Sequence, residues 1–188
     1  LKKSFALFIE KTPSIGKSIV CIDNKNLKSI LKQCQNKKIL TYGFSNEANY
    51  QITNVKREKV YSTFDLKIEF KRQKIKNIKV NVIGDHNISN ATASIVVALN
   101  LGIQVSKIKK ALKKFMGIQR RFTKVFSIEK RDFYDDYAHH PTEIAAVISG
   151  ARQVNKNRKI ICIFQPHRYS RVISLKNEFA QCFKLSDE

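Results

Sequence analysis

The spacing of apolar residues changes several times along the chain, and each spacing predicts a different element. Strict alternation over residues 60–71 is typical of a half-exposed strand. One helical face at the start of the chain is formed by Leu1, Phe5, Phe8 and Ile9. The elements predicted up to residue 115 are, in order, that helix, a strand at 18–22, a helix at 26–34, a strand at 39–44, the strand at 60–71, a hairpin connection at 72–77, a strand at 78–83, a helix after Gly84 and a helix at 106–115. We expect Ser106 to cap the last helix.

A second pattern begins after Met116-Gly117, which we interpret as a domain boundary. The elements predicted beyond it are strands at 124–129 and 132–136, a helix at 141–153, a strand at 159–164 and a helix at 175–183. Pro141 suits the first helical position and Glu143 the first turn. The continuous apolar run at 159–164 is typical of a central parallel strand. Alternating strands and helices predict an α/β fold, doubly wound in this second part.

The hydrophobic content and the charge of the chain limit which classes of function are expected. The chain has 188 residues, 43% of them hydrophobic, which is enough for a core. Its net charge of +21 invites a nucleic-acid interpretation, but 27 lysines stand against 9 arginines and are scattered along the whole chain. Arginine is the residue that reads bases and clamps phosphates, so we expect no specific nucleic-acid partner and only weak adhesion to polyanions.

Cysteine usage and hydropathy bear on location. The four cysteines lack CxxC spacing, which suits the reducing cytoplasm. No apolar run is as long as a membrane span and no signal peptide is visible, so we expect a cytoplasmic protein without a membrane partner. The chain opens without Met and ends within a helix-like run, and we therefore expect a segment of a longer protein.

Two dense polar segments follow predicted strands, "DDYAHH" at 135–140 and "QPHRYSR" at 165–171. Ligands of open α/β sheets bind outside the carboxyl ends of strands, and right-handed connections would bring both segments to one rim. Arg168 and Arg171 can clamp a carboxylate or a phosphate. His139 is a candidate proton carrier near neutral pH. The sequence thus predicts a site for an anionic ligand.

Simpler interpretations of the same residues stay open. The two aspartates can serve capping and solvation, and the two histidines can be one packed ring and one capping ring. A metal site built from Asp135, Asp136, His139 and His140 is disfavoured, because four ligands so close in sequence rarely converge on one ion. We therefore predict no metal ligands here.

Two further segments carry candidate chemistry and a third is rejected. In "GDHNISN", Asn87 and Asn90 share a helical face, and asparagine amides can read adenine; the alternative is that Asn87 caps the helix. In "QRRF" at 119–122, adjacent arginines can balance phosphate charge or simply be solvated. "KTPSIGKS" mimics a P-loop, but Lys11 stands where glycine is required and the segment precedes a strand instead of following one.

Four motifs in order resemble the Mur ligases of bacterial cell-wall synthesis. They are "GDHNISNA" (84–91), "GIQRRF" (117–122), "DDYAHHPTE" (135–143) and "FQPHRYSR" (164–171). The resemblance covers nearly the whole chain. It implies that residues 1–116 are the C-terminal part of a central ATP-binding domain with a strand hairpin. Residues 117–188 would be the N-terminal part of a Rossmann-like C-terminal domain.

The resemblance also implies an activity. The family uses ATP to activate a carboxylate as an acyl phosphate, which an amine then attacks. The most similar member joins L-alanine to UDP-N-acetylmuramate, so these are the expected substrates in peptidoglycan synthesis, with ATP and Mg²⁺ as cofactors. The alternative is a non-catalytic basic module that binds nucleotides or polyanions.

Individual roles carry over onto the matching residues. Asn87 and Asn90 would contact adenine, Arg121 the ATP phosphates and Asp136 the ribose. The expected substrate-binding residues are Tyr137, His139, Arg168 and Arg171, and the expected catalytic residues are Arg121 and His139. Ala138 replaces the usual glycine. The P-loop lysine and most Mg²⁺ ligands would lie before Leu1, so we expect the chain alone to be inactive.

Overall fold

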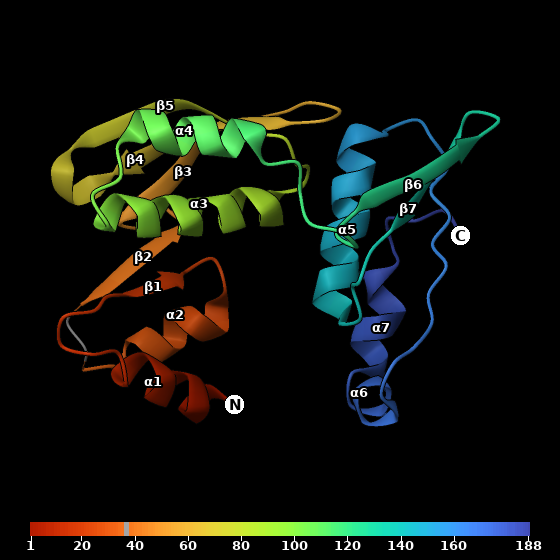
Figure 1. The fold of residues 1–188 in the computed structure, drawn as a ribbon. Coiled ribbons are helices and arrows are strands. Elements are labelled where there is room, and N and C mark those ends of the chain that lie inside the picture. Colours follow the sequence, from red (N-terminus) through yellow and green to blue (C-terminus); the bar gives the residue numbers. More distant parts are fainter. Residues whose placement is uncertain (36–37) are drawn as a thin grey trace. The chain divides into compact units, whose positions relative to one another are not determined.

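A computed structural model describes residues 1–35 and 38–188, which divide into two compact units. Unit 1 contains residues 1–56, 63–80 and 87–114. Unit 2 contains the short segments 57–62 and 81–86 together with residues 115–188. Figure 1 shows the helices and strands of each unit. No helix in the described part of the chain is long and apolar enough to cross a membrane.

A five-stranded mixed sheet forms the centre of unit 1. Its strands, in spatial order, are β1 (Ser18–Cys21), β2 (Ile39–Gly43), β3 (Tyr50–Arg57), β4 (Ser62–Ile68) and β5 (Gln73–Val80). β1 pairs with β2 in parallel, and β2 pairs with β3 in parallel. β3, β4 and β5 follow one another through short connections, which suit only antiparallel neighbours. Alternate residues of β4 are buried, as its pattern predicts.

Helices pack on this sheet in two pairs. α1 (Lys2–Glu10) and α2 (Lys25–Leu31) lie beside β1, whereas α3 (Asp85–Asn100) and α4 (Val105–Lys114) lie along the later strands (Figure 1). The Asn24 side chain accepts hydrogen bonds from the backbone N–H groups of Asn26 and Leu27 and so caps α2. Ile9, Val20 and Ile30 form the small core under α1 and α2.

The apolar face predicted for the first helix is mostly not buried. Ile9 is 5% exposed, but Leu1 is 93% and Phe8 is 77% exposed. Periodicity identifies which residues share a face, whereas burial requires a partner for that face. α1 meets its neighbours through Ile9 and Ala6, so Leu1 and Phe8 stay largely in solvent.

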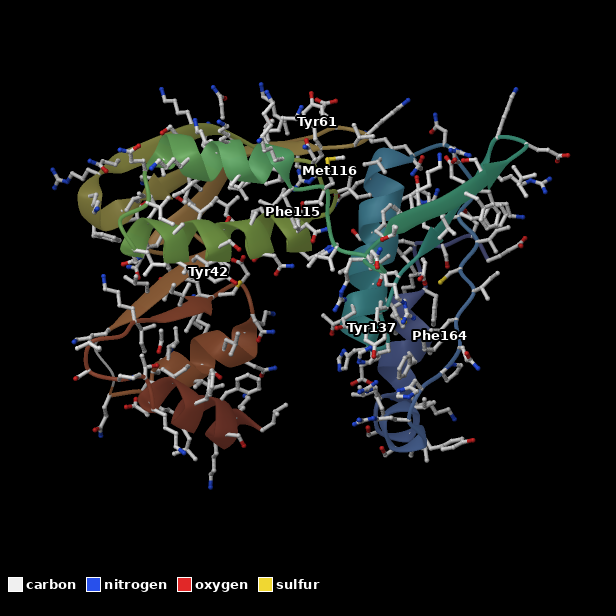
Figure 2. All side chains as sticks on the ribbon, in the orientation of Figure 1. Tyr42, Tyr61, Phe115, Met116, Tyr137 and Phe164 are labelled. Atoms are coloured by element: carbon white, nitrogen blue, oxygen red, sulfur yellow. The ribbon has the colours of Figure 1, made fainter. Side chains whose placement is uncertain are left out.

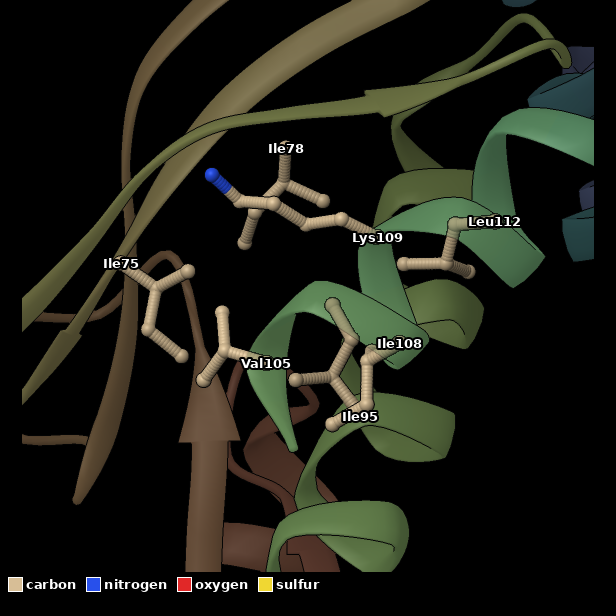
Figure 3. Close-up of a pocket in the computed structure, with 7 residues that line it drawn as sticks. All are labelled: Ile75, Ile78, Ile95, Val105, Ile108, Lys109 and Leu112. Carbon is tan, nitrogen blue, oxygen red and sulfur yellow. The ribbon is translucent and has the colours of Figure 1, made fainter. Parts of the chain in front are cut away.

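α4 is held on β5 by an apolar layer. Figure 3 shows Val105, Ile108 and Leu112 of α4 facing Ile75 and Ile78 of β5. Ser106 was predicted to cap this helix, but the helix begins one residue earlier, at Val105. The Ile108 N–H donates to the carbonyl oxygen of Gln104, so the first helical turn already includes Ser106.

The hairpin connection predicted at 72–77 is also displaced. The chain turns through a short 3₁₀ helix, η1 (Glu69–Lys71), and Arg72, which has a φ of 49°. β5 then starts at Gln73, so most of the predicted connection is strand. The turn is set by the left-handed backbone conformation of Arg72, and the polar composition of the segment did not reveal that position.

Unit 2 combines a hairpin with helices. β6 (Thr123–Ile128) and β7 (Arg131–Asp135) form an antiparallel two-stranded sheet. The helices are α5 (Pro141–Val154), α6 (Tyr169–Ser174) and α7 (Lys176–Cys182). Ile144 and Ile148 of α5 pack on Phe179 and Cys182 of α7. Phe164, labelled in Figure 2, adds its ring to Phe179 at a centroid distance of 5.6 Å.

The apolar run at 159–164 is not a strand, contrary to the prediction. Its backbone hydrogen bonds go to the last residues of the chain: Asp187 N–H donates to Ile160, and Cys162 N–H donates to Glu188. Ile163 is 94% exposed. A central strand needs a hydrogen-bonded neighbour on each side, and in the described residues β6 and β7 pair only with each other.

Candidate functional site

Two loops of unit 2 are joined through Asp136. One carboxylate oxygen accepts the backbone N–H of Phe122 at 2.8 Å, and the other accepts that of Ala138 at 2.7 Å. The Tyr137 N–H donates to the Arg120 carbonyl oxygen at 2.8 Å. The "RRF" and "DDYA" segments therefore form one structure before any ligand binds. The carboxylate of Asp136 thus binds loop amides, whereas the residue that caps the following helix is His140.

The adjacent arginines differ in their surroundings. Arg120 Nε lies 3.4 Å from an Asp135 carboxylate oxygen, and its guanidinium lies 5.0 Å from the centre of the Tyr137 ring. Arg121 is exposed, and its guanidinium makes no ion pair or hydrogen bond within the described residues. Arg121 is therefore the member of the pair that is available to an anionic ligand.

His139 is oriented by two neighbours. Its Nδ1 lies 3.0 Å from the Tyr137 carbonyl oxygen, and its backbone N–H donates to Glu143 Oε2 at 3.1 Å. A carbonyl oxygen only accepts, so Nδ1 is the donor in this contact, and Nδ1 also lies 3.7 Å from Glu143 Oε2. Burial raises the pKa of Glu143, but the N–H groups of His139 and His140 outweigh it and lower that pKa overall. Glu143, which the sequence indicated only as a first-turn acid, is thus a support for His139.

His140 has a different task from its neighbour. Its Nδ1 accepts the backbone N–H of Thr142 at 3.3 Å, which makes His140 the N-cap of α5. Pro141 occupies the first position of the helix, as predicted. One of the two adjacent histidines is therefore a cap, and the other is a candidate for ligand contact.

The "QPHRYSR" segment reaches the same region of unit 2 by its own route. Arg171 Nη1 lies 3.4 Å from the His139 carbonyl oxygen. Arg168 precedes α6 with a φ of 67°, a conformation that is costly for any residue other than glycine. Tyr137, labelled in Figure 2, is half exposed, and its ring centre lies 5.2 Å from that of His139. The two polar segments meet although no parallel sheet places them on a common rim.

Asn87 and Asn90 lie in the first two turns of α3, which belongs to unit 1 from residue 87 onward. Asn87 is the third residue of the helix and so is not its cap. The two side chains share a face, as their spacing predicts. The structure therefore brings Arg121, Asp136, Tyr137, His139 and Arg171 together and places the asparagine pair in the other unit.

His86 lies with the unit 2 residues, and the sequence interpretation missed it as a site residue. Burial lowers the pKa of its imidazole, the carboxylates of Asp136 and Asp85 raise it, and Arg121 lowers it further, so that the pKa is lowered overall. The ring is thus uncharged at pH 7. The signal in the sequence was its position directly before Asn87 in "GDHN".

This arrangement can hold an anion. It offers the unpaired guanidinium of Arg121, a second arginine at Arg171, the imidazole of His139 and a carboxylate with spare acceptor capacity at Asp136. No group of three or more metal-ligating side chains occurs in residues 1–35 and 38–188. The site therefore has the character of a phosphate- or carboxylate-binding surface on an α/β protein.

Comparison with known proteins gives the family. The Mur ligase middle domain matches residues 1–98, and the Mur ligase, glutamate ligase domain matches residues 120–188. The chain belongs to the Mur ligase family. The predicted resemblance and the α/β fold class are thereby confirmed.

Several relatives are informative. The UDP-N-acetylmuramate–L-alanine ligase of Pelagibacter ubique is 51% identical over 100% of this chain and 41% of its own length. The crystal structure of the Thermotoga maritima UDP-N-acetylmuramate–alanine ligase matches 92% of this chain and 36% of its own, with a TM-score of 0.71 and 28% identity. A murein peptide ligase from Psychrobacter arcticus matches 100% of this chain and 39% of its own, with a TM-score of 0.70 and 26% identity. The chain spans about two fifths of the curated relatives it matches.

Proposed function

We propose that the gene product carrying this chain ligates L-alanine to UDP-N-acetylmuramate at the expense of ATP, through an acyl phosphate, in peptidoglycan synthesis. The 51% identity to the Pelagibacter ligase supports this choice of substrates. The observation that carries the chemistry is the unpaired guanidinium of Arg121, in the segment whose next residue, Phe122, donates its N–H to Asp136. We propose that the domain boundary lies at Met116-Gly117 and that the chain acts as a segment of the ligase.

The proposed roles follow from what each group can offer. Arg121 places a fixed cation at the phosphates, where negative charge is redistributed during transfer. Asp136 has acceptor capacity left beyond its two loop amides, which suits ribose hydroxyls. Asn87 and Asn90 supply paired donors and acceptors for adenine.

The two substrates other than ATP, one carrying the carboxylate and one the amine, would be bound by Tyr137, His139, Arg168 and Arg171. The imidazole of His139 can donate or accept a hydrogen bond, and Tyr137 lines the surface beside it. Arg168 and Arg171 suit a carboxylate, because a guanidinium can form two parallel hydrogen bonds to it. Holding the carboxylate and the amine in place contributes through positioning, with no covalent bond to the protein.

Mg²⁺ is usually held by one or two protein carboxylates together with substrate phosphates, and the described residues contain no group of three or more metal-ligating side chains. Mg²⁺ prefers carboxylate oxygen and phosphate oxygen, and Asp136 already accepts two backbone N–H groups. We therefore assign no step in this chain to the metal, and we propose, as the family resemblance implies, that its protein ligands lie mainly outside the chain.

The test is ADP release by the gene product with UDP-N-acetylmuramate and each of two amines, L-alanine and a murein peptide. Release that depends on L-alanine supports the proposal, whereas release that depends only on the murein peptide would assign a different ligase. If ADP is released with neither amine, the proposed ligase activity is contradicted. Arg121→Gln should abolish release, and Lys124→Gln, on the exposed hairpin, is the matched charge control.

The competing function is a non-catalytic basic module, and one observation favours it. β5 carries three lysines and α4 carries five, with no acidic residue in either element. Such a surface predicts polyanion binding that weakens steeply with salt. This binding should survive Arg121→Gln and fall when lysines of α4 are replaced. The ligase proposal expects the reverse dependence for ADP release.

A further inference from the structure

Helix α5 carries a glycine in its interior, where glycine weakens a helix relative to alanine. Gly150 is the tenth of the 14 residues of α5 and is buried. Ile144 and Ile148 of the same helix pack on α7, so α5 is held on that side. A glycine at such a position is favourable only where another segment requires the space that a side chain would fill.

The loop that leads into α3 occupies this space. A Cβ atom on Gly150 would lie 3.3 Å from the Gly84 Cα atom and 3.7 Å from the Gly84 backbone nitrogen. In the other direction, a Cβ atom on Gly84 would lie 3.7 Å from the Gly150 Cα atom. Both glycines belong to unit 2, so the contact is internal to that unit. The backbone of the loop thus touches the backbone of the helix, with no side chain between them.

Gly84 is restricted by its own conformation as well. Its φ is 88°, in the left-handed region that glycine adopts without strain. A Cβ atom there would lie 2.6 Å from His86 Cε1 and 2.8 Å from His86 Nδ1. A side chain on Gly84 would therefore displace the imidazole, and a side chain on Gly150 would displace the loop backbone.

An ion pair holds the next residue of the loop. Arg57 Nε donates to Asp85 Oδ1 at 2.8 Å, and Arg57 Nη2 donates to Asp85 Oδ2 at 2.9 Å. Two parallel bonds from one guanidinium fix the direction of a carboxylate as well as its distance. Asp85 is the first residue of α3 and directly follows Gly84. The entry to α3 is therefore held at two consecutive residues, by α5 at Gly84 and by Arg57 at Asp85.

We propose that Gly150 and Arg57 are positioning residues that fix the start of α3 and thereby aim Asn87 at adenine. Asp85 and Asn87 lie in the same helical turn, so a displacement of Asp85 is passed to Asn87 along the helix. Two hydrogen bonds to one base edge require an exact side-chain position, and a small misplacement weakens both. The inference rests on the proposed function in taking Asn87 and Asn90 as the adenine contacts. The contacts made by Gly84 and Asp85 are present without ligand.

Discrimination between two nucleotides tests the inference on the whole gene product. Calorimetry gives the dissociation constants of ATP and of GTP, which shares the ribose and the triphosphate of ATP but carries a different base. Gly150→Ala and Arg57→Gln should each weaken ATP binding about fivefold or more and change GTP binding by less than about twofold. Arg57→Lys keeps the charge and should fall between the parent protein and Arg57→Gln. Lys59→Gln, at an exposed lysine two residues along the chain, is the matched charge control and should bind both nucleotides like the parent protein.

The two nucleotides separate positioning from a general loss of structure. Equal weakening of ATP and GTP binding would overturn the inference. Unchanged ATP binding in a variant would overturn the role of the residue that it replaces. The Arg57–Asp85 pair is 37% and 43% exposed, so Arg57→Gln tests the loop in a folded protein even if Gly150→Ala does not fold.

Thermal unfolding without nucleotide tests the contact at Gly150 by itself. Gly150→Ala should lower the melting temperature, because the Gly84 backbone has to move, whereas the melting temperature would rise if the helix had room for the methyl group. A parent protein that binds ATP no more tightly than GTP would contradict the proposed adenine contacts. In that case a lower melting temperature of Gly150→Ala would still support the loop contact, and a higher one would overturn it.

Discussion

Replacement of Asp136 by asparagine tests whether this carboxylate stabilises the loops as well as binding a ligand. The question arises because the carboxylate accepts loop N–H groups before any nucleotide binds. Asp136 accepts the N–H groups of Phe122 and Ala138. An asparagine keeps one acceptor oxygen and turns an NH₂ group toward the other N–H, so one charge-assisted bond is lost and one backbone donor is left without an acceptor. A bond to a charged group contributes about 1.5–3 kcal/mol, and the site is half exposed, so we expect a loss of about 2 kcal/mol.

The matched control is the same change one residue earlier. Asp135 pairs with Arg120 at 3.4 Å, and the side chains are 47% and 62% exposed. Exposed pairs of this kind contribute from nothing to about 1 kcal/mol, so Asp135→Asn should cost about 0.5 kcal/mol or less. Urea unfolding followed by circular dichroism measures both, without nucleotide. Equal stability of the two variants would show that Asp136 serves only a ligand and would refute the assigned loop contacts.

Three further changes test the packing and the charges of the two units. Ile148→Ala should lower the free energy of unfolding by about 2–4 kcal/mol, and Ile163→Ala by under about 0.5 kcal/mol. The reason is that Ile148 is 4% exposed and Ile163 is 94% exposed, and urea unfolding measures both variants. Gly43→Ala should lower the melting temperature, since a Cβ atom there would lie 2.5 Å from an Asp23 carboxylate oxygen that receives a loop N–H group. Burial raises the pKa of Asp65, but bonds from Asn77, Asn54 and Lys74 outweigh it and lower that pKa overall. The stability that the Asp65 carboxylate contributes is therefore complete above its unfolded-state pKa and is lost as the pH falls through its lower folded-state pKa. The parent protein should thus be more stable than Asp65→Asn at neutral pH. Acid unfolding curves should show this difference in stability shrinking from about pH 5 downward.

Several features were predictable because they depend on neighbours in sequence. Alternation located β4, and Pro141 and Glu143 located the start of α5. The spacing of Asn87 and Asn90 placed them on one helical face. Four motifs in order were enough to predict the family. In each case the local period or the residue type carries the information, and no distant contact is needed.

Other features were decided by contacts between distant segments. Residues 159–164 have the composition of a central strand, yet their backbone bonds go to Asp187 and Glu188. α1 has a full apolar face, of which Ile9 is buried. A strand or a buried face exists only where a partner is present, and periodicity in one segment does not specify that partner.

The candidate site shows the same division at the level of single side chains. The sequence by itself determined that two arginines and two aspartates are present, each pair adjacent along the chain. Only the tertiary structure decided that Arg120 pairs with Asp135, that Asp136 binds loop amides and that Arg121 stays free. The physical reason is that charge and hydrogen-bonding capacity belong to the residue, whereas their satisfaction depends on which donors and acceptors the fold brings within about 3 Å.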